Sequence, residues 1–565
     1  MSTPKINSDS LVNSVQTALE SLGSVGAPKR IWDRDASFWK SEPEHQAIIK
    51  NALGWLTVPR MMSERVSELE AFVDEIRAAE FTHVMLLGMG GSSLCPEVFR
   101  RTFGHRDGYP ELLVLDTTDP DTIADLESRV DLRWTLFIVA SKSGSTIEPL
   151  SFYKYFYDRV QAIKGESAGN NFVAITDPGT LMERMATEAN FRRIFLNPAD
   201  IGGRYSALSY FGMLPAALMG VDVGELLRRA AAAMDECGPT VGAEHNPAFR
   251  LGALMGAAAA AGRDKLTIVA DGDLESVGLW IEQLVAESTG KEGKGIIPIA
   301  HEDLGAPDEY GDDRLFAFIH SGAPLPETRA KLEALAAAGH PVVEHALDGP
   351  IGLGAEFFQW ELATAVAGHL MSINPFDQPN VQESKDATNA LLAEFKESGE
   401  LPITEALATD GALSVYGMLP EDVSSVSTAL SALMAGVKTG DYFAVLAYIQ
   451  ETEEHTRLLQ AIRGRVQDKF KVATTVGYGP RFLHSTGQLH KGGPDSGVFL
   501  QITDVDAVDL GIPGEPYTFS VLKQAQASGD FTSLAKRNRR ALRLDVGNDA
   551  AAGLRWLLEM VGTRA

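Results

Sequence analysis

A hydroxyl-rich turn is the clearest chemical signal in this sequence. Residues 141–146 read Ser-Lys-Ser-Gly-Ser-Thr and directly follow an apolar run that predicts a buried strand. Hydroxyl and backbone N–H groups at a helix start can donate hydrogen bonds to phosphate oxygens, and Lys142 supplies a counter-charge. The segment lacks the GxxxxGK[ST] pattern of a nucleotide P-loop. We therefore predict a phosphomonoester site, with an N-cap that carries extra serines as the structural alternative.

A glycine-rich loop precedes this turn in the chain. Residues 88–93 read Gly-Met-Gly-Gly-Ser-Ser and lie between a predicted strand and a predicted helix. Glycines let the backbone approach an anion closely, and the helix N-terminus offers unpaired N–H groups. Asp116, at the end of the next strand, would suit a dinucleotide fold. Ser93 stands where the third glycine of that fingerprint is needed, which disfavours dinucleotide binding. We therefore predict a sugar or phosphate loop, with a merely tight strand–helix turn as the structural alternative.

Two later segments carry charged side chains of opposite sign. Arg204 follows two glycines, and backbone that bends sharply there can direct a guanidinium into a cleft. Gln283 and Glu287 are four residues apart, which places them on one face of a predicted helix. A carboxylate among apolar residues is a candidate general base. The alternatives are a structural arginine and an ion pair between Glu287 and Lys291.

A rigid turn completes the set of candidate segments. Residues 374–379 read Asn-Pro-Phe-Asp-Gln-Pro, and prolines on both sides of Asp377 and Gln378 restrict the backbone before a predicted helix. Lys385 follows Gln378 by seven residues, which is about two turns of a helix. Gln378 and Lys385 could therefore face one cleft.

Strands and crossover helices must position these segments. The apolar runs are continuous rather than alternating, which is typical of strands buried on both faces. Candidate strands are 83–88, 112–116, 135–141, 172–177, 193–197, 265–271, 295–301, 314–321, 341–347, 442–449, 471–479, 497–504 and 541–547. Helices are expected at 149–162, 208–227 and 228–262. This βαβ pattern predicts an α/β fold with parallel sheets and helices on both sides.

The pattern divides the chain into four parts. We expect an N-terminal helical appendage at 1–78, a first α/β domain at 79–225, a second at 226–385 and a C-terminal α/β extension at 386–565. Clefts between packed domains are where ligands would bind.

Composition excludes several classes of partner. The 565 residues include 50 Lys and Arg against 76 Asp and Glu, a net charge of −26. Such a surface repels phosphate backbones and anionic lipid, so neither nucleic acid nor membrane is expected as a partner. Cys95 and Cys237 cannot form a disulfide framework. Neither a secretory signal nor a membrane-spanning stretch is visible, so we expect a cytoplasmic protein.

The five segments, taken in this order, resemble the phosphoglucose isomerase family over about residues 80–385. The resemblance implies two sugar-isomerase-type domains, a sugar phosphate at their junction and a homodimer. It also implies reversible conversion of glucose 6-phosphate to fructose 6-phosphate through a cis-enediol, with no metal and no cofactor.

Matching each segment to the family implies a role for each residue. Glu287 would move the proton and Arg204 would stabilise the enediolate. The residues that would bind the substrate are Gly91, Ser92, Ser141, Lys142, Ser143, Thr146, Gln283 and Gln378, and Lys385 would complete the catalytic group.

The C-terminal extension lies outside that family pattern. Residues 478–494 resemble the isomerase half of bifunctional transaldolase–isomerase fusions. Only about 80 residues precede the first isomerase domain, too few for the barrel of a transaldolase half.

The group that opens the sugar ring is not assigned by these segments. Many family members carry a histidine for this step where Glu356 stands here. Our candidate is His490, in a polar, glycine-rich segment beside Lys491, with His301 and His345 as alternatives. A structural histidine is the alternative for each.

Three other functions fit part of the pattern. The fold could serve a regulatory protein that binds a sugar phosphate without catalysis. An isomerase of a related phosphosugar, such as a mannose derivative, is a second alternative. A metal-dependent isomerase would need clustered histidine and carboxylate ligands, and His301-Glu302-Asp303 is too compact to supply three to one ion.

Overall fold

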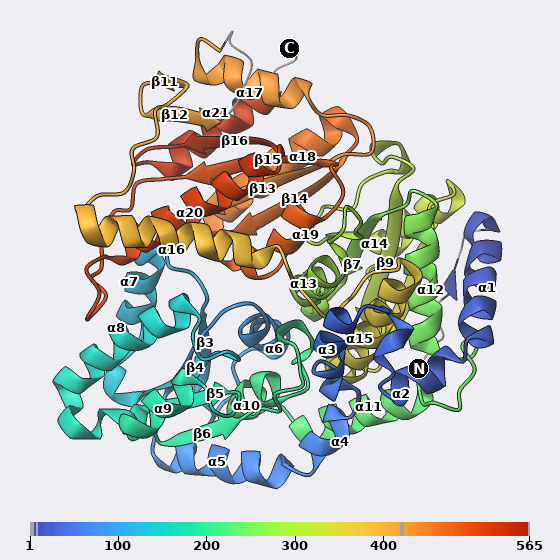
Figure 1. Cartoon of the computed structure of the whole chain (residues 1–565), viewed down its shortest axis with the longest axis horizontal. Helices are drawn as coiled ribbons and strands as arrows, with labels where there is room; N and C mark the ends of the chain where they lie inside the picture. Colours follow the sequence, from blue (N-terminus) through green and yellow to red (C-terminus); the bar gives the residue numbers. More distant parts are fainter. Residues whose placement is uncertain (1–4, 7–8, 418–422, 563–565) are drawn as a thin grey trace.

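Three separate sheets organise the molecule (Figure 1). The computed structural model describes residues 5–6, 9–417 and 423–562. The first sheet has the order β3-β2-β4-β5-β6, and all its strands are parallel. Its strands are β2 (His83–Gly88), β3 (Glu111–Leu115), β4 (Thr135–Ala140), β5 (Phe172–Thr176) and β6 (Arg193–Leu196). The sequence predicted each of them to within about two residues, because both-face burial produces an unbroken apolar run.

The second sheet has the order β1-β10-β9-β7-β8. Its parallel strands are β7 (Lys265–Ala270), β8 (Ile297–Ile299), β9 (Arg314–Ser321) and β10 (Val342–Leu347). The short strand β1 (Lys5–Ile6) pairs antiparallel with β10 and was not expected. Two residues give too short a pattern to be recognised in a sequence.

The third sheet belongs to the C-terminal extension and is mixed. Strands β13 (Tyr442–Tyr448), β14 (Ala473–Tyr478), β15 (Gly497–Thr503) and β16 (Arg540–Asp545) are parallel. Strands β11 (Ala408–Asp410) and β12 (Leu413–Gly417) add an antiparallel edge beyond β16. The expected α/β extension is therefore confirmed, with an antiparallel edge that the sequence analysis did not predict.

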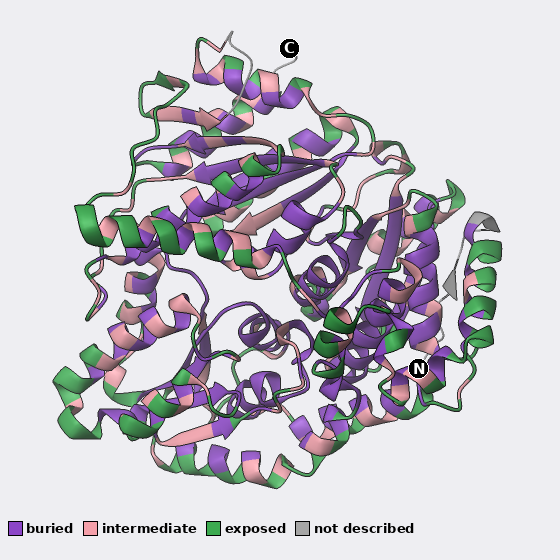
Figure 2. Cartoon of the chain, viewed as in Figure 1, coloured by how far each residue is buried: buried purple, intermediate pink, exposed green. Residues whose placement is uncertain are grey.

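Helices cover both faces of these sheets, and the strands between them are mostly buried (Figure 2). The helices between the strands of the first sheet are α6 (Leu94–Phe103), α7 (Pro120–Ser128), α8 (Ile147–Lys164) and α9 (Leu181–Glu188). Helix α10 (Tyr210–Leu218) follows the first sheet and packs on α6. The helices of the second unit are α11 (Val223–Glu236), α12 (Pro247–Ala260), α13 (Val277–Thr289), α14 (Pro326–Ala337) and α15 (Leu353–Leu370). Those of the third are α16 (Val381–Ser398), α17 (Val426–Ala435), α18 (Glu453–Phe470), α19 (Gly487–Gly492), α20 (Phe519–Lys536) and α21 (Ala550–Gly562).

Two expected helices are shorter than the sequence suggested. The stretch 208–227 is broken between α10 and α11, where Asp222 caps α11 by accepting a hydrogen bond from the Glu225 N–H (2.9 Å). The Ala-rich stretch 228–262 is broken between α11 and α12, because Asn246 caps α12 just before Pro247. Caps and a proline at the first helical position start new helices within an apolar pattern that otherwise looks continuous.

The N-terminal residues are mainly helical. The helices are α1 (Asp9–Ser24), α2 (Ala27–Trp32), α3 (Pro43–Lys50), α4 (Val58–Ser63) and α5 (Val66–Ala78). Helices α1 and α4 pack on the second unit, whereas α5 packs on the first unit, where Phe72 contacts Phe195 of β6. Trp39 donates its indole N–H to the Ala365 carbonyl of α15 (2.8 Å). The domain boundaries expected at residues 225 and 385 fall inside α11 and α16. These two helices therefore connect neighbouring units.

A buried ion pair joins the third unit to the first. Arg481, in the short 3₁₀ helix η10 (Arg481–His484), donates two hydrogen bonds to Asp116 (2.8 and 2.9 Å). Asp116 follows β3 and is buried. Because a buried carboxylate needs a charged partner, this pair fixes η10 beside the first sheet.

Candidate active site

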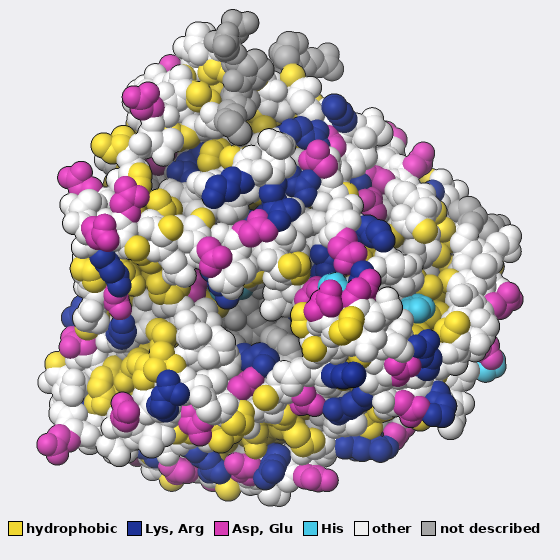
Figure 3. Space-filling model, viewed as in Figure 1, with side chains coloured by type: hydrophobic (Ala, Val, Ile, Leu, Met, Phe, Trp, Pro, Cys, Tyr) yellow, Lys and Arg dark blue, Asp and Glu magenta, His cyan; other side chains and the backbone are white. Residues whose placement is uncertain are grey.

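A cavity of about 180 Å³ lies where the three units meet. On the face seen in Figure 3 the molecule is hollowed near its centre, among acidic and basic side chains. The residues expected from the sequence that line this cavity are Gly91, Ser92, Ser141, Lys142, Ser143, Thr146, Arg204, Gln283, Glu287, Gln378 and Lys385. A second pocket of about 240 Å³ shares Ser143, Thr146 and Lys385 with it. The five segments therefore converge, although they are far apart in the chain.

The glycine loop allows the Arg204 turn to come close. A Cβ atom on Gly91 would collide with the carbonyl of Gly203. Ser206 also donates its hydroxyl to the Gly91 carbonyl (3.3 Å). Glycine at this position is thus required by backbone packing, which in turn places the arginine beside the loop.

Arg204 is buried, with 2% of its surface exposed, and all its nitrogens are bonded. Nε donates to the Ser288 hydroxyl (2.7 Å), Nη1 to the Gln378 side-chain carbonyl (2.8 Å), and Nη2 to the backbone carbonyls of Pro375 (2.7 Å) and Asp377 (3.0 Å). Nη1 also lies 3.7 Å from the Glu287 carboxylate. The guanidinium is therefore a fixed positive charge between α13 and the turn 374–379.

Glu287 and Gln283 lie on one face of α13, as their spacing predicted. The Gln283 amide nitrogen donates to the backbone carbonyl of His484 (2.7 Å) and lies 3.4 Å from the Glu287 carboxylate. Glu287 is 8% exposed and lines the cavity. The alternative of a Glu287–Lys291 ion pair is not what the structure shows, because Lys291 pairs with Asp377 instead.

The hydroxyl-rich turn lies between β4 and the N-terminus of α8. The hydroxyls of Ser141 and Ser143 lie 3.3 and 3.4 Å from that of Thr146. Lys142 lines the cavity, but its ammonium pairs with Asp177 and donates to the Ala199 carbonyl (3.1 Å). Asp177 therefore offsets part of the charge that Lys142 brings to the turn.

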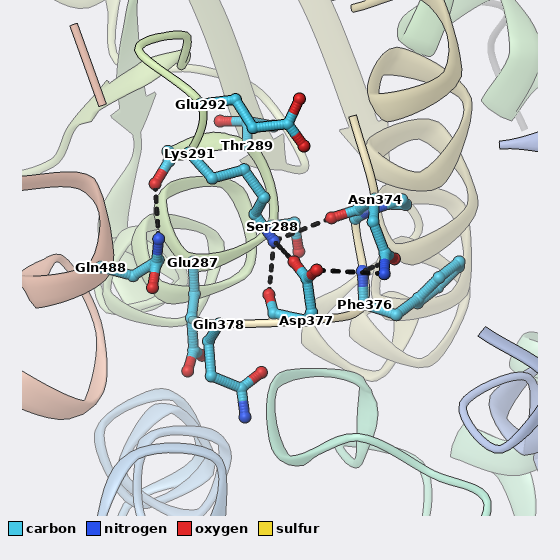
Figure 4. A network of polar contacts seen from close by, with 12 residues as sticks. Glu287, Ser288, Thr289, Lys291, Glu292, Asn374, Phe376, Asp377, Gln378 and Gln488 are labelled. Carbon is cyan, nitrogen blue, oxygen red and sulfur yellow. Dashed lines mark hydrogen bonds and ion pairs between the residues drawn. The ribbon is translucent and has the colours of Figure 1, made fainter. Parts of the chain in front are cut away.

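A buried lysine holds the turn 374–379 (Figure 4). The Lys291 ammonium donates to the Asn374 carbonyl (2.8 Å) and the Asp377 carboxylate (2.7 Å). Burial lowers the pKa of Lys291 to about 8, and the nearby Arg204 acts in the same direction. In Figure 4 the side chains of Glu287 and Gln378 point to the same side of this network. The network thus fixes Gln378 relative to Glu287.

His484 is a site residue that the sequence analysis missed. It lines both pockets, and its Nε2 lies 2.9 Å from the Glu148 carboxylate at the start of α8. Gln526 of α20 donates to the same carboxylate oxygen (2.7 Å). Burial alone would raise the pKa of Glu148, yet its contact with His484 leaves that pKa below its usual value. The carboxyl is thus ionised at neutral pH and orients the imidazole.

The structure does not place His490 in the lining of either pocket. His490 is 2% exposed in α19, and its ring packs near Tyr442, Phe482 and Phe499. Among the described residues, neither ring nitrogen has a hydrogen-bond partner. Burial lowers its pKa well below the usual value. His490 is therefore a neutral core residue. The signal that could have pointed to His484 is its place six residues after the end of β14, at the carboxyl edge of a parallel sheet.

The other candidates for ring opening also lie elsewhere. His345 and Glu356 are buried together, with Nδ1 of the histidine 3.2 Å from the carboxylate. His301 lines a different cavity, which also contains Asp303, whereas Glu302 turns inward to pair with Arg314 (2.6 Å). The side chains of His301, Glu302 and Asp303 therefore point in different directions and cannot bind one ion together.

In the part of the chain that the structure describes, one carboxylate group is compact enough for a metal ion: Asp119, Asp121 and Asp506. The Lys523 ammonium already pairs with Asp119 (2.9 Å) and Asp506. This group lies outside the candidate active site. Within the same described residues, no helix has the length and apolar character needed to cross a bilayer.

Known proteins are similar to this chain in sequence and in fold. The fold and the cleft define an α/β protein of the sugar-isomerase type. The profile of the phosphoglucose isomerase family matches residues 57–325. A glucose-6-phosphate isomerase of Rubrobacter xylanophilus is 30% identical over 395 residues, covering 61% of this chain and 90% of that protein. This chain belongs to the phosphoglucose isomerase family.

Other known proteins are similar to this chain in sequence or in fold. A glucose-6-phosphate isomerase of Clostridium novyi is 28% identical over 391 residues, 60% of this chain and 86% of that protein. A hypothetical protein of Thermus thermophilus has a similar structure (TM-score 0.58, 27% identity, 69% of this chain and 100% of that chain). A glucose-6-phosphate isomerase of Chlamydia trachomatis shares the fold (TM-score 0.52, 21% identity, 66% and 78% covered).

The Gly91 contact gives a first prediction. Gly91→Ala should lower the free energy of unfolding by about 1–3 kcal/mol, because the new Cβ must displace buried backbone. Gly202→Ala is the matched control, since its Cβ would lie 3.8 Å from Tyr205, an ordinary contact. Denaturant unfolding of both variants measures the difference. Equal stability of the two variants would show that the close approach is not needed.

Lys291 gives a prediction about pH. In an unfolded chain the pKa of lysine is about 10.4, so from about pH 8 to pH 10 the folded protein has released a proton that the unfolded chain retains. The stability that Lys291 contributes should therefore rise with pH over this window. The test is the free energy of unfolding of the wild type minus that of Lys291→Met, measured across it. A difference that falls as pH rises would contradict the lowered pKa.

Proposed function

We propose that this chain is a glucose-6-phosphate isomerase that interconverts glucose 6-phosphate and fructose 6-phosphate. The observation that carries the proposal is the convergence of Glu287, Arg204 and the turn 141–146 on one cavity. The names of the relatives support the same reaction. A coupled assay with fructose 6-phosphate tests it directly.

The hydroxyl-rich turn would hold the phosphate. Ser141, Ser143 and Thr146 present hydroxyls beside the N-terminus of α8, where backbone N–H groups favour an anion. Lys385 adds an ammonium for which no hydrogen bond or ion pair is seen among the described residues. Binding at this end orients the sugar and lets remote contacts support the chemistry at C1 and C2.

Glu287 would transfer the proton. Its carboxylate takes the proton from C2 of the open-chain aldose, and the electron pair forms the enediolate as the C1 carbonyl gains negative charge. The O2 hydroxyl proton moves to O1, and the same carboxylate then returns its proton to C1 as the C2 carbonyl forms, so a single base suffices for transfer between the carbons. Arg204 is permanently charged and fixed by four hydrogen bonds, so it stabilises that oxyanion without rearranging.

His484 would open the ring. Because Nε2 contacts the Glu148 carboxylate, Nδ1 is the nitrogen left to exchange a proton with the substrate. An imidazolium can give its proton to the ring oxygen as the bond from C1 to that oxygen breaks, and the neutral imidazole then takes the proton of the C1 hydroxyl as the aldehyde forms. His484 belongs to the third unit and lies outside the residues that match the family profile.

Other parts of the assignment are also proposals. Homodimer formation rests on the resemblance to the family, and a cytoplasmic location is supported by two buried, unpaired cysteines. Kinship with the isomerase half of transaldolase–isomerase fusions rests on the resemblance of segment 478–494, of which His484 lines the cavity. Division into 1–78, 79–225, 226–385 and 386–565 is supported because each sheet, apart from the two-residue strand β1, lies within one part.

Replacement of the base gives the central functional prediction. Glu287→Gln should lower kcat by about 10²–10⁴, because an amide cannot accept the proton. Affinity for fructose 6-phosphate should stay within a few fold, since the phosphate contacts are untouched. Glu292→Gln, at an exposed carboxylate five residues along the chain, is the control and should turn over normally. Near-normal turnover of Glu287→Gln would show that Glu287 is not the base that transfers the proton.

A pair of histidine variants separates His484 from His490. His484→Asn should reduce kcat by at least about tenfold, because the acid–base group for ring opening is lost. His490→Phe, among aromatic side chains, should keep the wild-type rate. Steady-state kinetics with both sugar phosphates measures this. A larger loss in the His490 variant would reverse the assignment.

A further inference from the structure

Another cavity, of about 440 Å³, lies between the second and third units and also touches α6 of the first unit. It is larger than the active-site cavity and is called the second cavity below. Its walls include the loop after β7, the residues after β8, the end of β14 and helix α18. The carboxyl ends of parallel strands from two sheets thus open into one space. In open α/β sheets this edge is where ligands bind.

Glu282 of α13 lines this cavity without a partner. No described residue forms a hydrogen bond or ion pair with its carboxyl group. Burial raises the pKa of Glu282 to about 8, and the Arg463 guanidinium opposes that shift only in part. An uncompensated carboxyl in a cavity costs free energy, which a ligand with the opposite charge would recover.

The charges around the cavity select the class of ligand. Acidic residues are in excess, with Asp273, Glu275, Glu282, Asp303 and Glu451 against two arginines. Both arginines are engaged by carboxylates: Arg481 pairs with Asp116 and Glu451, and Arg101 with Glu97 and Glu451. Such a site disfavours phosphates and other anions.

A bare metal ion also fits poorly. Among the described residues, the carboxylates of this cavity do not come within one ion's reach of each other in threes. Glu282 is partly buried, whereas Asp273, Glu275 and Asp303 are exposed. Carboxylates at two depths suit a flexible cation with two charged ends better than a single point charge.

The cavity shares two walls with the candidate active site. On α13, Leu279 and Glu282 face the second cavity, whereas Gln283 and Glu287 face the first. In and beside η10, Arg481, Phe482 and Ser485 line the second cavity, and His484 lines the first. A ligand that moves either wall would therefore move the proposed base or the ring-opening histidine.

We propose that this cavity binds a small aliphatic diamine, with one ammonium on Glu282 and the other at the exposed carboxylates, and that binding alters the isomerase site through α13 and η10. The effect on catalysis rests on the proposed function, whereas binding does not.

Calorimetry of the full chain with 1,4-diaminobutane tests the site. We expect saturable binding of one diamine per chain, weakened at least about tenfold by Glu282→Gln. Loss of that ion pair would cost about 1.4 kcal/mol or more. The neutral isostere 1,4-butanediol should not bind. Absence of saturable binding, equal binding of the diol, or binding unaffected by Glu282→Gln would each overturn the site.

Kinetics with fructose 6-phosphate tests the coupling. Saturating diamine should change kcat or KM at least about twofold in the wild type and not in Glu282→Gln, whose basal rate should match the wild type. Lys29→Gln, at an exposed ion pair remote from both cavities, is a control for nonspecific charge effects and should respond like the wild type. Diamine binding without any kinetic change would overturn the coupling but not the binding site. Absence of isomerase activity without diamine would instead contradict the proposed function.

Discussion

The site depends on one buried guanidinium. A buried arginine must have all its donors satisfied, and Arg204 satisfies them with Ser288 of α13 and with residues of the turn 374–379. This requirement draws together a helix of the second unit and the turn that precedes α16. The Gly91 contact then brings the first sheet to the same point. The active-site cavity lies between the elements that these contacts hold together.

The third unit contributes side chains to the candidate active site. Glu148 of the first unit meets His484 and Gln526 of the third, and Thr118 donates to the Gln526 side-chain carbonyl (2.7 Å). Arg481 and Asp116 reinforce this contact with a buried ion pair. The imidazole is therefore held between two units by hydrogen bonds that either unit alone could not make.

Helix α13 separates two chemically different spaces. One face carries the carboxylate beside a permanent positive charge, which suits anionic intermediates. The adjoining face carries an isolated carboxyl in an acidic cavity. Because packed interiors resist small displacements, a rigid helix with a functional group on each face can couple them.

The local features of this protein can be predicted from residue order alone. Unbroken apolar runs marked the strands of three sheets, and the spacing of Gln283 and Glu287 placed both on one helix face, because burial and helical period leave a direct trace in residue order. Tertiary structure decided which distant groups meet. His484 and His490 lie in one short polar segment, yet packing of η10 and α19 exposes the first to the cavity and buries the second. The partners of Arg204 and the isolation of Glu282 likewise depend on contacts between units, and no local pattern encodes contacts between residues so far apart in the chain.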